Sequence, residues 1–221
     1  MAEIYPEKTC ISNGISKWLG AGGWRIGFMI VPREMSAVVD AMNMYNSEIN
    51  SGVSSPIQWA TIKGFEDTPE MTEYFANSKA ILKTISTIFR RTLGEAGVAC
   101  TKTGDLGSYY VLMDFTNQPK TAALRAKYEK WEHRETKKFG DMVFEMMLEE
   151  SGCALLHAAA FGLPKEELFF RVSFADFDGG VLLEKAKTEE INEEFVKREC
   201  SRLFEGLQAL ITWWTVTEVK A

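Results

Sequence analysis

An α/β fold is predicted by short apolar runs near the N-terminus and by the long amphipathic segments that follow them. The runs Thr9–Ser12 and Ile26–Val31 are flanked by glycine and polar residues, as buried strands of an α/β sheet are. Behind them, apolar residues recur at helical spacing over residues 35–45 and 71–93. With 221 residues, the chain is long enough for one large or two small domains.

The composition excludes several classes of function. A net charge of −6 argues against nucleic acid as a main partner, and no apolar run approaches the roughly 18 residues of a membrane span. The N-terminus lacks the basic and apolar stretches of a secretory signal. The four cysteines are widely spaced, so neither a metal site nor a disulfide framework is expected. The default expectation is therefore a cytoplasmic location with reduced thiols.

Residues 13–27 form the first candidate site, because they combine Lys17, a glycine cluster and Arg25. A lysine amine can form a Schiff base with a carbonyl group, and the planar guanidinium of arginine matches a phosphate. Glycines allow the backbone to approach a ligand closely. A lysine that holds an aldehyde and an arginine that holds a phosphate describe a pyridoxal phosphate site. The alternative is a glycine-rich connection between strands with a solvated lysine and arginine.

This segment resembles the pyridoxal-phosphate attachment signature of class I and II aminotransferases, which have the aspartate-aminotransferase fold. The match runs from the small residue Ser16 before Lys17 through Trp24, Arg25 and the residues that follow. The resemblance implies that Lys17 forms the Schiff base with the cofactor and that Arg25 binds the cofactor phosphate.

The same resemblance implies an α/β fold that is the C-terminal part of a fold-type-I pyridoxal-phosphate-dependent transferase. Residues 1–66 are expected to be a remnant of the large cofactor-binding domain and its sheet. Residues 67–221 are expected to be the α+β small domain with its bridging helix. Family members reach the strand before Lys17 only after a long N-terminal portion, and Tyr5 lies too close to Lys17 to match the cofactor-contacting tyrosine of the family. We therefore expect a truncated chain that forms a homodimer or pairs with a missing N-terminal portion.

The remaining elements are predicted from apolar periodicity and turn residues. Thr68 is expected to cap the longest helix, and Gly94 or Gly97 to end it. The charged stretch 117–138 is expected to be a surface helix or loop, with a substrate lid as the alternative. Helices are predicted over residues 34–49, 57–65, 68–94, 141–150 and 190–214, and strands over residues 108–115, behind a turn at Gly104 and Gly107, and 153–156.

Arg171 lies in the middle of the apolar run Phe169–Ala175 and is the second candidate site residue. Burying an arginine is costly unless an anion pairs with it. One interpretation is a structural ion pair with one of the 31 acidic residues. The run also resembles the C-terminal strand of the aminotransferase family, and that resemblance implies that Arg171 binds the α-carboxylate of the substrate.

His157 marks a departure from the family pattern, in which Pro-Gly precedes small residues and Phe-Gly. Here His157 and Ala158 stand in place of Pro-Gly ahead of Phe161 and Gly162. A single histidine is more often a hydrogen-bonded structural residue than a catalyst. His157 is therefore kept as a candidate beside that structural interpretation.

Taken together, the resemblance implies transfer of an amino group between an amino acid and a 2-oxo acid in amino-acid metabolism, with pyridoxal 5'-phosphate as cofactor. Lys17 would act as base and acid, Arg25 would hold the cofactor and Arg171 the substrate. Two alternatives stay open: a pyridoxal-phosphate-dependent lyase or synthase on the same fold, and an inactive fragment kept as an interaction or structural protein. The sequence does not identify the amino donor or acceptor.

Overall fold

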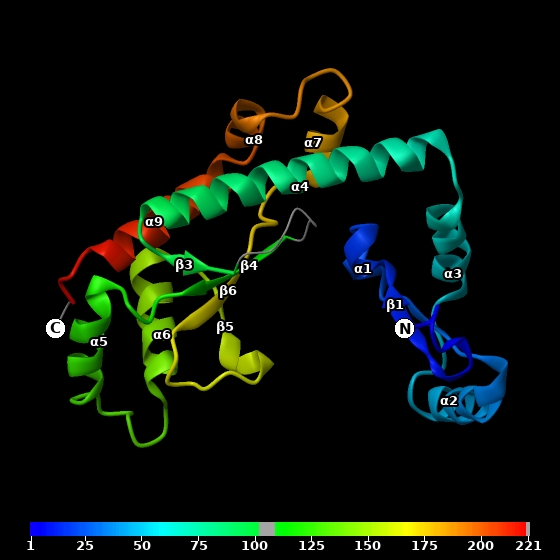
Figure 1. Ribbon diagram of the computed structural model, residues 1–221, viewed down its shortest axis with the longest axis horizontal. Coiled ribbons are helices and arrows are strands. Elements are labelled where there is room, and N and C mark those ends of the chain that lie inside the picture. Colours follow the sequence, from blue (N-terminus) through cyan, green and yellow to red (C-terminus); the bar gives the residue numbers. More distant parts are fainter. Residues whose placement is uncertain (102–108, 220–221) are drawn as a thin grey trace. The chain divides into compact units, whose positions relative to one another are not determined.

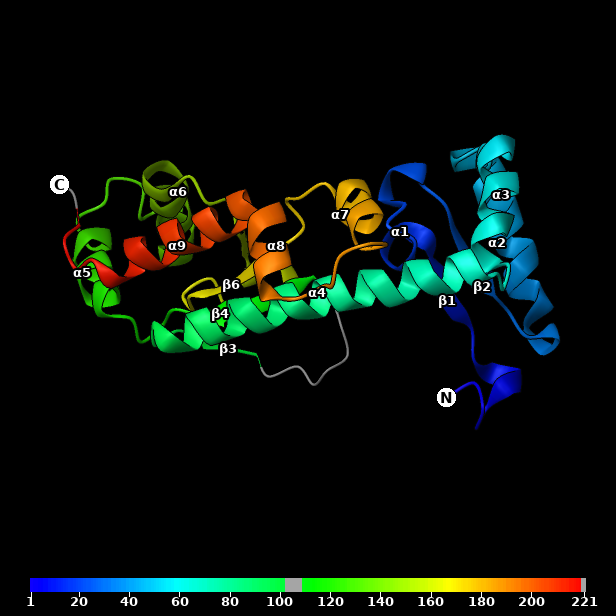
Figure 2. The same cartoon turned by 90° about the horizontal axis from the view of Figure 1, so that it is seen from above.

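The computed structural model describes residues 1–101 and 109–219, and it divides the chain into two compact units. Unit 1 comprises Met1–Thr72 and unit 2 comprises Glu73–Ala221. Figure 1 labels most helices and strands of both units, and Figure 2, in which β2 is also labelled, gives a second view of them.

Unit 1 contains a two-stranded antiparallel sheet and short helices. Gly14 lies opposite Gly27 in this sheet, and a Cβ on Gly27 would lie 3.1 Å from the carbonyl oxygen of Asn13. The two glycines therefore allow the strands to approach closely where they end. The elements of unit 1 are β1 (Ile11–Gly14), α1 (Ile15–Trp18), β2 (Gly27–Ile30), α2 (Ser36–Ile49), α3 (Ser55–Ile62) and the first turn of α4 (Pro69–Glu95).

The prediction that the two N-terminal strands are buried is wrong for this chain. Met29 and Ile30 of β2 are 41% and 56% exposed, and every residue of β1 except Gly14 is exposed. In unit 1, all of which the structure describes, only Ile15 and Thr61 are buried. The physical reason is that two short strands have too little area to cover their own apolar side chains, and unit 1 has no further strand beside them.

Unit 2 is organised around a four-stranded antiparallel sheet with the order β3-β4-β6-β5. Its strands are β3 (Ala99–Cys100), β4 (Tyr110–Asp114), β5 (Leu156–His157) and β6 (Phe169–Ser173). Burial alternates along β4 and β6, as the period of a strand requires. One face of the sheet is buried in the core and carries Val111, Met113, Phe170 and Val172. Arg171 lies half-buried on the other face.

Three of the expected strands can be compared with this sheet. The strands predicted at 108–115 and 169–175 are confirmed as β4 and β6, although Gly104, Gly107 and residue 108 lie outside the described residues. The strand predicted at 153–156 is shifted, because β5 contains only Leu156 and His157. Cys153 instead follows the end of a helix at Gly152, whose φ of 71° is favoured by glycine.

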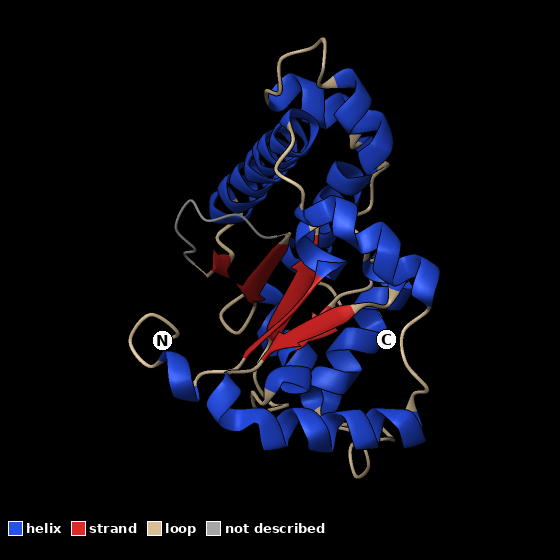
Figure 3. Ribbon diagram, turned by 90° about the vertical axis from the view of Figure 1, so that its right-hand side faces the viewer, coloured by secondary structure: helices blue, strands red, loops and turns tan. Residues whose placement is uncertain are grey.

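The helices of unit 2 cover the buried face of the sheet, and Figure 3 shows them beside the strands. Phe89 of α4 packs against Phe174 and Phe204 with ring centroids 5.5 and 5.9 Å apart, and Phe115 stacks on Trp214 at 4.3 Å. The helices after α4 are α5 (Pro119–Tyr128), α6 (Phe139–Ser151), α7 (Gly179–Lys185), α8 (Glu193–Glu199) and α9 (Ser201–Thr215).

The predicted helix after Thr68 is confirmed as α4. The Thr68 hydroxyl accepts a hydrogen bond from the backbone N–H of Met71 at 3.3 Å, as an N-cap does. The helix ends at Glu95, and Gly97 follows with a φ of 72°. The helices predicted over 34–49 and 141–150 are likewise present as α2 and α6.

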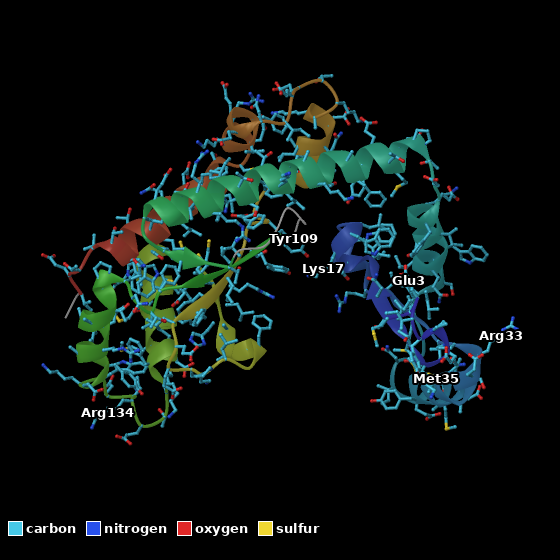
Figure 4. All side chains as sticks on the ribbon, in the orientation of Figure 1. Glu3, Lys17, Arg33, Met35, Tyr109 and Arg134 are labelled. Carbon is cyan, nitrogen blue, oxygen red and sulfur yellow. The ribbon has the colours of Figure 1, made fainter. Side chains whose placement is uncertain are left out.

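The charged stretch 117–138 is only partly a surface segment. Residues 129–138 are mostly exposed, and Arg134 lies there between α5 and α6 (Figure 4). Helix α5, however, buries Lys120, Thr121 and Leu124. The Lys120 ammonium donates to the carbonyl of Trp213 at 3.0 Å and lies 3.9 Å from the Trp213 ring. The prediction failed here because a lysine was counted as solvated, although its ammonium has a buried acceptor.

The single long helix predicted over 190–214 is also wrong. The chain forms two helices, α8 and α9, separated at Cys200, whose φ and ψ of −115° and 34° are not helical. Asn192 caps the first helix by accepting a hydrogen bond from the N–H of Phe195 at 3.0 Å. Both helices still direct apolar side chains, such as Val196 and Leu207, into the core, so the apolar spacing looked continuous across the break.

Neither a membrane-spanning helix nor a metal cluster is found in the described part of the chain. None of its helices combines the length and the apolar character that crossing a bilayer requires. No three His, Cys, Asp or Glu side chains within 1–101 and 109–219 are grouped so that they could hold a metal ion.

Candidate functional site

Lys17 lies in α1, the single helical turn that follows β1 (Figure 4). Gly14 precedes this turn in extended conformation, and Ile15 within it is only 1% exposed. Ile15 therefore anchors the turn, while the side chain of Lys17 is exposed.

An aromatic contact further fixes the turn that bears Lys17. Phe65 meets Trp18 and Phe28 edge to face, with ring centroids 5.1 and 5.5 Å apart. Next to Phe65, a Cβ on Gly64 would overlap the side chain of Leu19, so a larger residue there would require the Leu19 side chain to move. These few contacts connect α1 to the segment after α3.

Arg25 follows the short 3₁₀ turn Gly22–Trp24 and adopts the left-handed conformation, with a φ of 53°. Its Nη1 donates a hydrogen bond to the carbonyl of Gly22 at 3.1 Å. The bond closes the glycine-rich loop and uses one of the five N–H donors of the guanidinium. The side chain is exposed.

The donor chemistry of this segment fits two groups of pyridoxal phosphate. The Lys17 amine suits an aldehyde, and the Arg25 guanidinium suits a phosphate. Between them, a Cβ on Gly23 would meet no atom within 4 Å, so the loop is open at that position. Lys17 and Arg25 both belong to unit 1.

Arg171 belongs to unit 2 and lies on the central strand β6, where Leu112 of β4 and Leu156 of β5 flank it in register. Its guanidinium carbon is 4.2 Å from the ring centroid of Tyr110 and 4.6 Å from that of Phe161. The Nε atom is buried and has no hydrogen-bond partner among the described residues. Within residues 1–101 and 109–219, no carboxylate forms an ion pair with Arg171, so a structural ion pair finds no support there.

His157 is engaged in local structure. Its Nδ1 accepts a hydrogen bond from the N–H of Ala159 at 3.1 Å, so Nε2 carries the proton and donates to the carbonyl of Glu167 at 2.9 Å. The ring also meets Phe170 edge to face at 5.0 Å. Both ring nitrogens are thus used to hold the 3₁₀ turn Ala158–Phe161, in agreement with the structural interpretation.

Tyr110 and Phe161 were not predicted as site residues from the sequence. Their proximity to Arg171 depends on the register of three strands and on the turn after β5, which cannot be read from local sequence. The sequence does resemble the family pattern at Phe161 and Gly162, but that resemblance gave no reason to place Phe161 beside Arg171.

The family model of aminotransferase class I and II matches residues 2–185. This match covers most of the chain and includes Lys17, Arg25 and Arg171. The protein therefore belongs to the class I and II aminotransferases, which have the fold-type-I architecture. The resemblance noted in the sequence is confirmed.

Curated relatives agree with this assignment. The chain is 31% identical over 183 residues to the aspartate/prephenate aminotransferase of Cereibacter sphaeroides, covering 80% of this chain and 40% of the relative. It is 28% identical over 177 residues to the probable aspartate/prephenate aminotransferase of Rhizobium leguminosarum, covering 78% of this chain and 40% of the relative. The chain thus spans about 40% of the length of these relatives.

Solved structures show the same fold. An aromatic aminotransferase from Pyrococcus horikoshii superposes with a TM-score of 0.62 at 18% identity, covering 94% of this chain and 43% of the other. An aspartate aminotransferase from Thermus thermophilus with maleate gives a TM-score of 0.59 at 20% identity, covering 93% and 43%. The fold-class prediction, a part of a fold-type-I α/β protein, is confirmed.

Proposed function

We propose that this chain takes part in pyridoxal-phosphate-dependent transfer of an amino group between an amino acid and a 2-oxo acid. The observation that carries the proposal is the environment of Arg171. Its buried Nε has no partner, and no carboxylate in the described part of the chain neutralises its charge. Such an arginine suits an anionic ligand, because charge-assisted bonds from a guanidinium to a carboxylate are the strong ones.

Each of the three candidate residues has a separate role in this proposal. When bound, pyridoxal phosphate would supply the electron-withdrawing ring that makes a proton at the substrate Cα removable, and would carry the amino group between the two half-reactions. Lys17 would hold the aldehyde and, once released, would take the proton from Cα and return it. Arg25 would bind the phosphate. Arg171 would bind the α-carboxylate with two parallel hydrogen bonds.

The proposal extends to domains and partners. Residues 1–66 would contribute to the cofactor-binding domain and residues 67–221 would form the small domain. The exposed apolar side chains of unit 1 support a homodimer, or pairing with a further portion of the protein, as the active form.

Reductive trapping tests the role of Lys17. The chain is incubated with pyridoxal phosphate and borohydride, and peptide mass spectrometry then locates the modified lysine. Lys17 should be labelled in preference to Lys63, whose side chain in the same unit is 77% exposed. The Lys17→Ala variant should lose the saturable visible absorption of the bound cofactor, while Lys63→Ala should keep it. Equal labelling of both lysines would contradict the assignment.

A second experiment separates amino transfer from the lyase and synthase chemistry of the same fold. A nitrogen-labelled amino acid and a 2-oxo acid are supplied to the full chain together with pyridoxal phosphate. Recovery of the label in a new amino acid supports transfer, whereas recovery in ammonia or in a cyclised product supports the alternative.

A further inference from the structure

Aromatic rings occupy the positions around Arg171 where a buried arginine usually has a carboxylate. Both ring distances, 4.2 Å for Tyr110 and 4.6 Å for Phe161, lie within the range of about 6 Å over which a ring face attracts a cation. A carboxylate would consume the N–H donors of the guanidinium and neutralise its charge. The attraction of a ring face does neither, so the arginine keeps its capacity to bind an anion.

The fold brings the two rings in from both flanks of β6. Tyr110 lies two residues from Leu112, the register partner of Arg171, so its side chain is diagonal to Arg171 on the same face. Phe161 comes from the turn after β5, on the other side of β6 in the sheet order. Its turn is fixed by the two hydrogen bonds of His157 and by Gly162, whose φ is 91°.

We propose that Tyr110 and Phe161 are positioning residues that hold the Arg171 guanidinium ready for a carboxylate ligand. We call the two rings the aromatic clamp. The proposal rests on the proposed function, in which Arg171 binds the substrate carboxylate. Its second support is the buried Nε without a partner, because a buried donor of this kind is costly until an acceptor arrives.

The clamp also explains why the arginine can lie on a half-buried face without an ion pair to any carboxylate that the structure describes. Arginine is hydrated more weakly than lysine and stacks on aromatic faces, so the two rings replace part of its hydration. They also restrict the rotamers of Arg171 before the ligand binds. Binding is then stronger, because less side-chain entropy is lost when the complex forms. His157 does not contribute a ring to the clamp but stabilises the turn Ala158–Phe161 that places Phe161 beside Arg171.

Nuclear magnetic resonance of the full chain, labelled with ¹⁵N-arginine, tests the proposal. The Nε–H signal of Arg171 is assigned by its absence in Arg171→Lys and is then titrated with maleate, with sodium chloride as the ionic-strength control. Tyr110→Leu and Phe161→Leu should each move the free Nε–H resonance, because ring-current effects are lost. Each should also weaken maleate binding about two- to fivefold, the fold-change of one ring contact.

Matched variants separate positioning from a general loss of stability. Tyr110→Phe keeps the ring and should keep most of the maleate affinity. Leu148→Ala removes an exposed apolar side chain from α6, which is neither a ring neighbour nor a register partner of Arg171, and should leave the resonance and the affinity unchanged. The proposal is overturned if both leucine variants leave either the free resonance or the affinity unaltered. If maleate does not perturb Arg171 in the unsubstituted chain, the proposed carboxylate role fails, whereas the free resonance of the variants still decides whether the clamp exists.

Discussion

Unit 1 and unit 2 contain similar kinds of elements but differ in how much apolar surface they bury. In unit 2, Phe170 and Trp214 are fully buried among the sheet and its helices. In unit 1, Trp59 and Met44 are 74% and 70% exposed, and α2 contains no buried residue. Because burial of apolar surface is the main favourable term in folding, we infer that unit 2 is stable by itself and that unit 1 depends on further contacts.

This difference bears on the candidate site. Arg171 lies on strand β6, whose other face is packed in the core of unit 2. Lys17 lies in a helical turn and Arg25 in a loop. This segment is supported by one buried residue, Ile15, and by a small aromatic contact. We therefore expect the conformation of Arg171 to be better defined in this chain than the conformations of Lys17 and Arg25.

The largest effect is expected for truncation of a core aromatic residue. Phe170→Ala should lower the free energy of unfolding of unit 2 by about 3–5 kcal/mol, because the ring is fully buried and a cavity remains. The matched change Phe65→Ala removes the central ring of the aromatic contact in unit 1, yet that residue is 55% exposed and should cost less than about 1 kcal/mol. Denaturant unfolding followed by tryptophan fluorescence measures both, and equal costs would refute the comparison.

A smaller effect is expected for the charged pairs of the two units. Lys120→Ala should destabilise unit 2 by about 2–4 kcal/mol, because the carbonyl of Trp213 loses its donor and the carboxylate of Glu150, 3.9 Å away, loses its cation. Lys120→Met, which keeps the apolar stem, should cost less. The exposed Lys63–Glu66 pair of unit 1 serves as control, since Lys63→Ala should change stability by no more than about 0.5 kcal/mol. A Lys120→Ala variant as stable as the parent chain would show that this lysine is not a structural cation.

Arg171→Lys should separate binding from stability within unit 2. Losing one charge-assisted hydrogen bond, about 1.5–3 kcal/mol, corresponds to a drop in maleate affinity of about 10- to 150-fold. The thermal midpoint should change little, because no carboxylate of the described residues pairs with Arg171. Calorimetric titration measures the maleate affinity, and thermal unfolding measures the midpoint. An unaltered affinity with a lowered midpoint would mean that Arg171 is a structural residue.

Alkaline pH should weaken unit 2 through Cys200. Burial, aided by the charge of Glu199, raises the pKa of this thiol from 9.0 to about 11, because the thiolate is disfavoured in the core. The folded-state pKa lies above the unfolded one, so the stabilisation is complete below pH 9 and is lost as the pH rises from 9 to about 11. The loss is on the order of 2 kcal/mol. Cys200→Ala should abolish this pH dependence, and Cys10→Ala in unit 1 should preserve it.

The sequence predicted elements best where apolar periodicity coincided with a turn or cap residue. Thr68 and Gly97 bracket α4 in this way, and Gly152 ends α6. The prediction failed where the local structure depends on residues that are distant in the sequence or on a break that the apolar spacing does not reveal. Lys120 is buried because a carbonyl from α9 accepts its hydrogen bond, and Cys200 interrupts a helix whose apolar spacing continues across the break.

The sequence predicted the candidate site residues themselves but not their surroundings. Lys17, Arg25 and Arg171 were predicted because motif resemblance connects residue types with chemistry. The half-buried position of Arg171 between Tyr110 and Phe161 could not be predicted, because it requires the register of β4, β5 and β6. A short apolar run does not by itself reveal which surface covers it, but the expectation that residues 1–66 are a remnant of a larger sheet is consistent with the exposure of β1 and β2.

Hydrogen exchange of the full chain, measured by mass spectrometry, compares the two units most directly. The backbone amides of β1 and β6 are suitable, because both strands are antiparallel and belong to different units. Amides of β6 should exchange at least about 100-fold more slowly than those of β1, since core strands open only with the whole unit whereas weakly packed segments open locally. Comparable protection of β1 and β6 in the isolated chain would contradict the conclusion that unit 1 depends on further contacts.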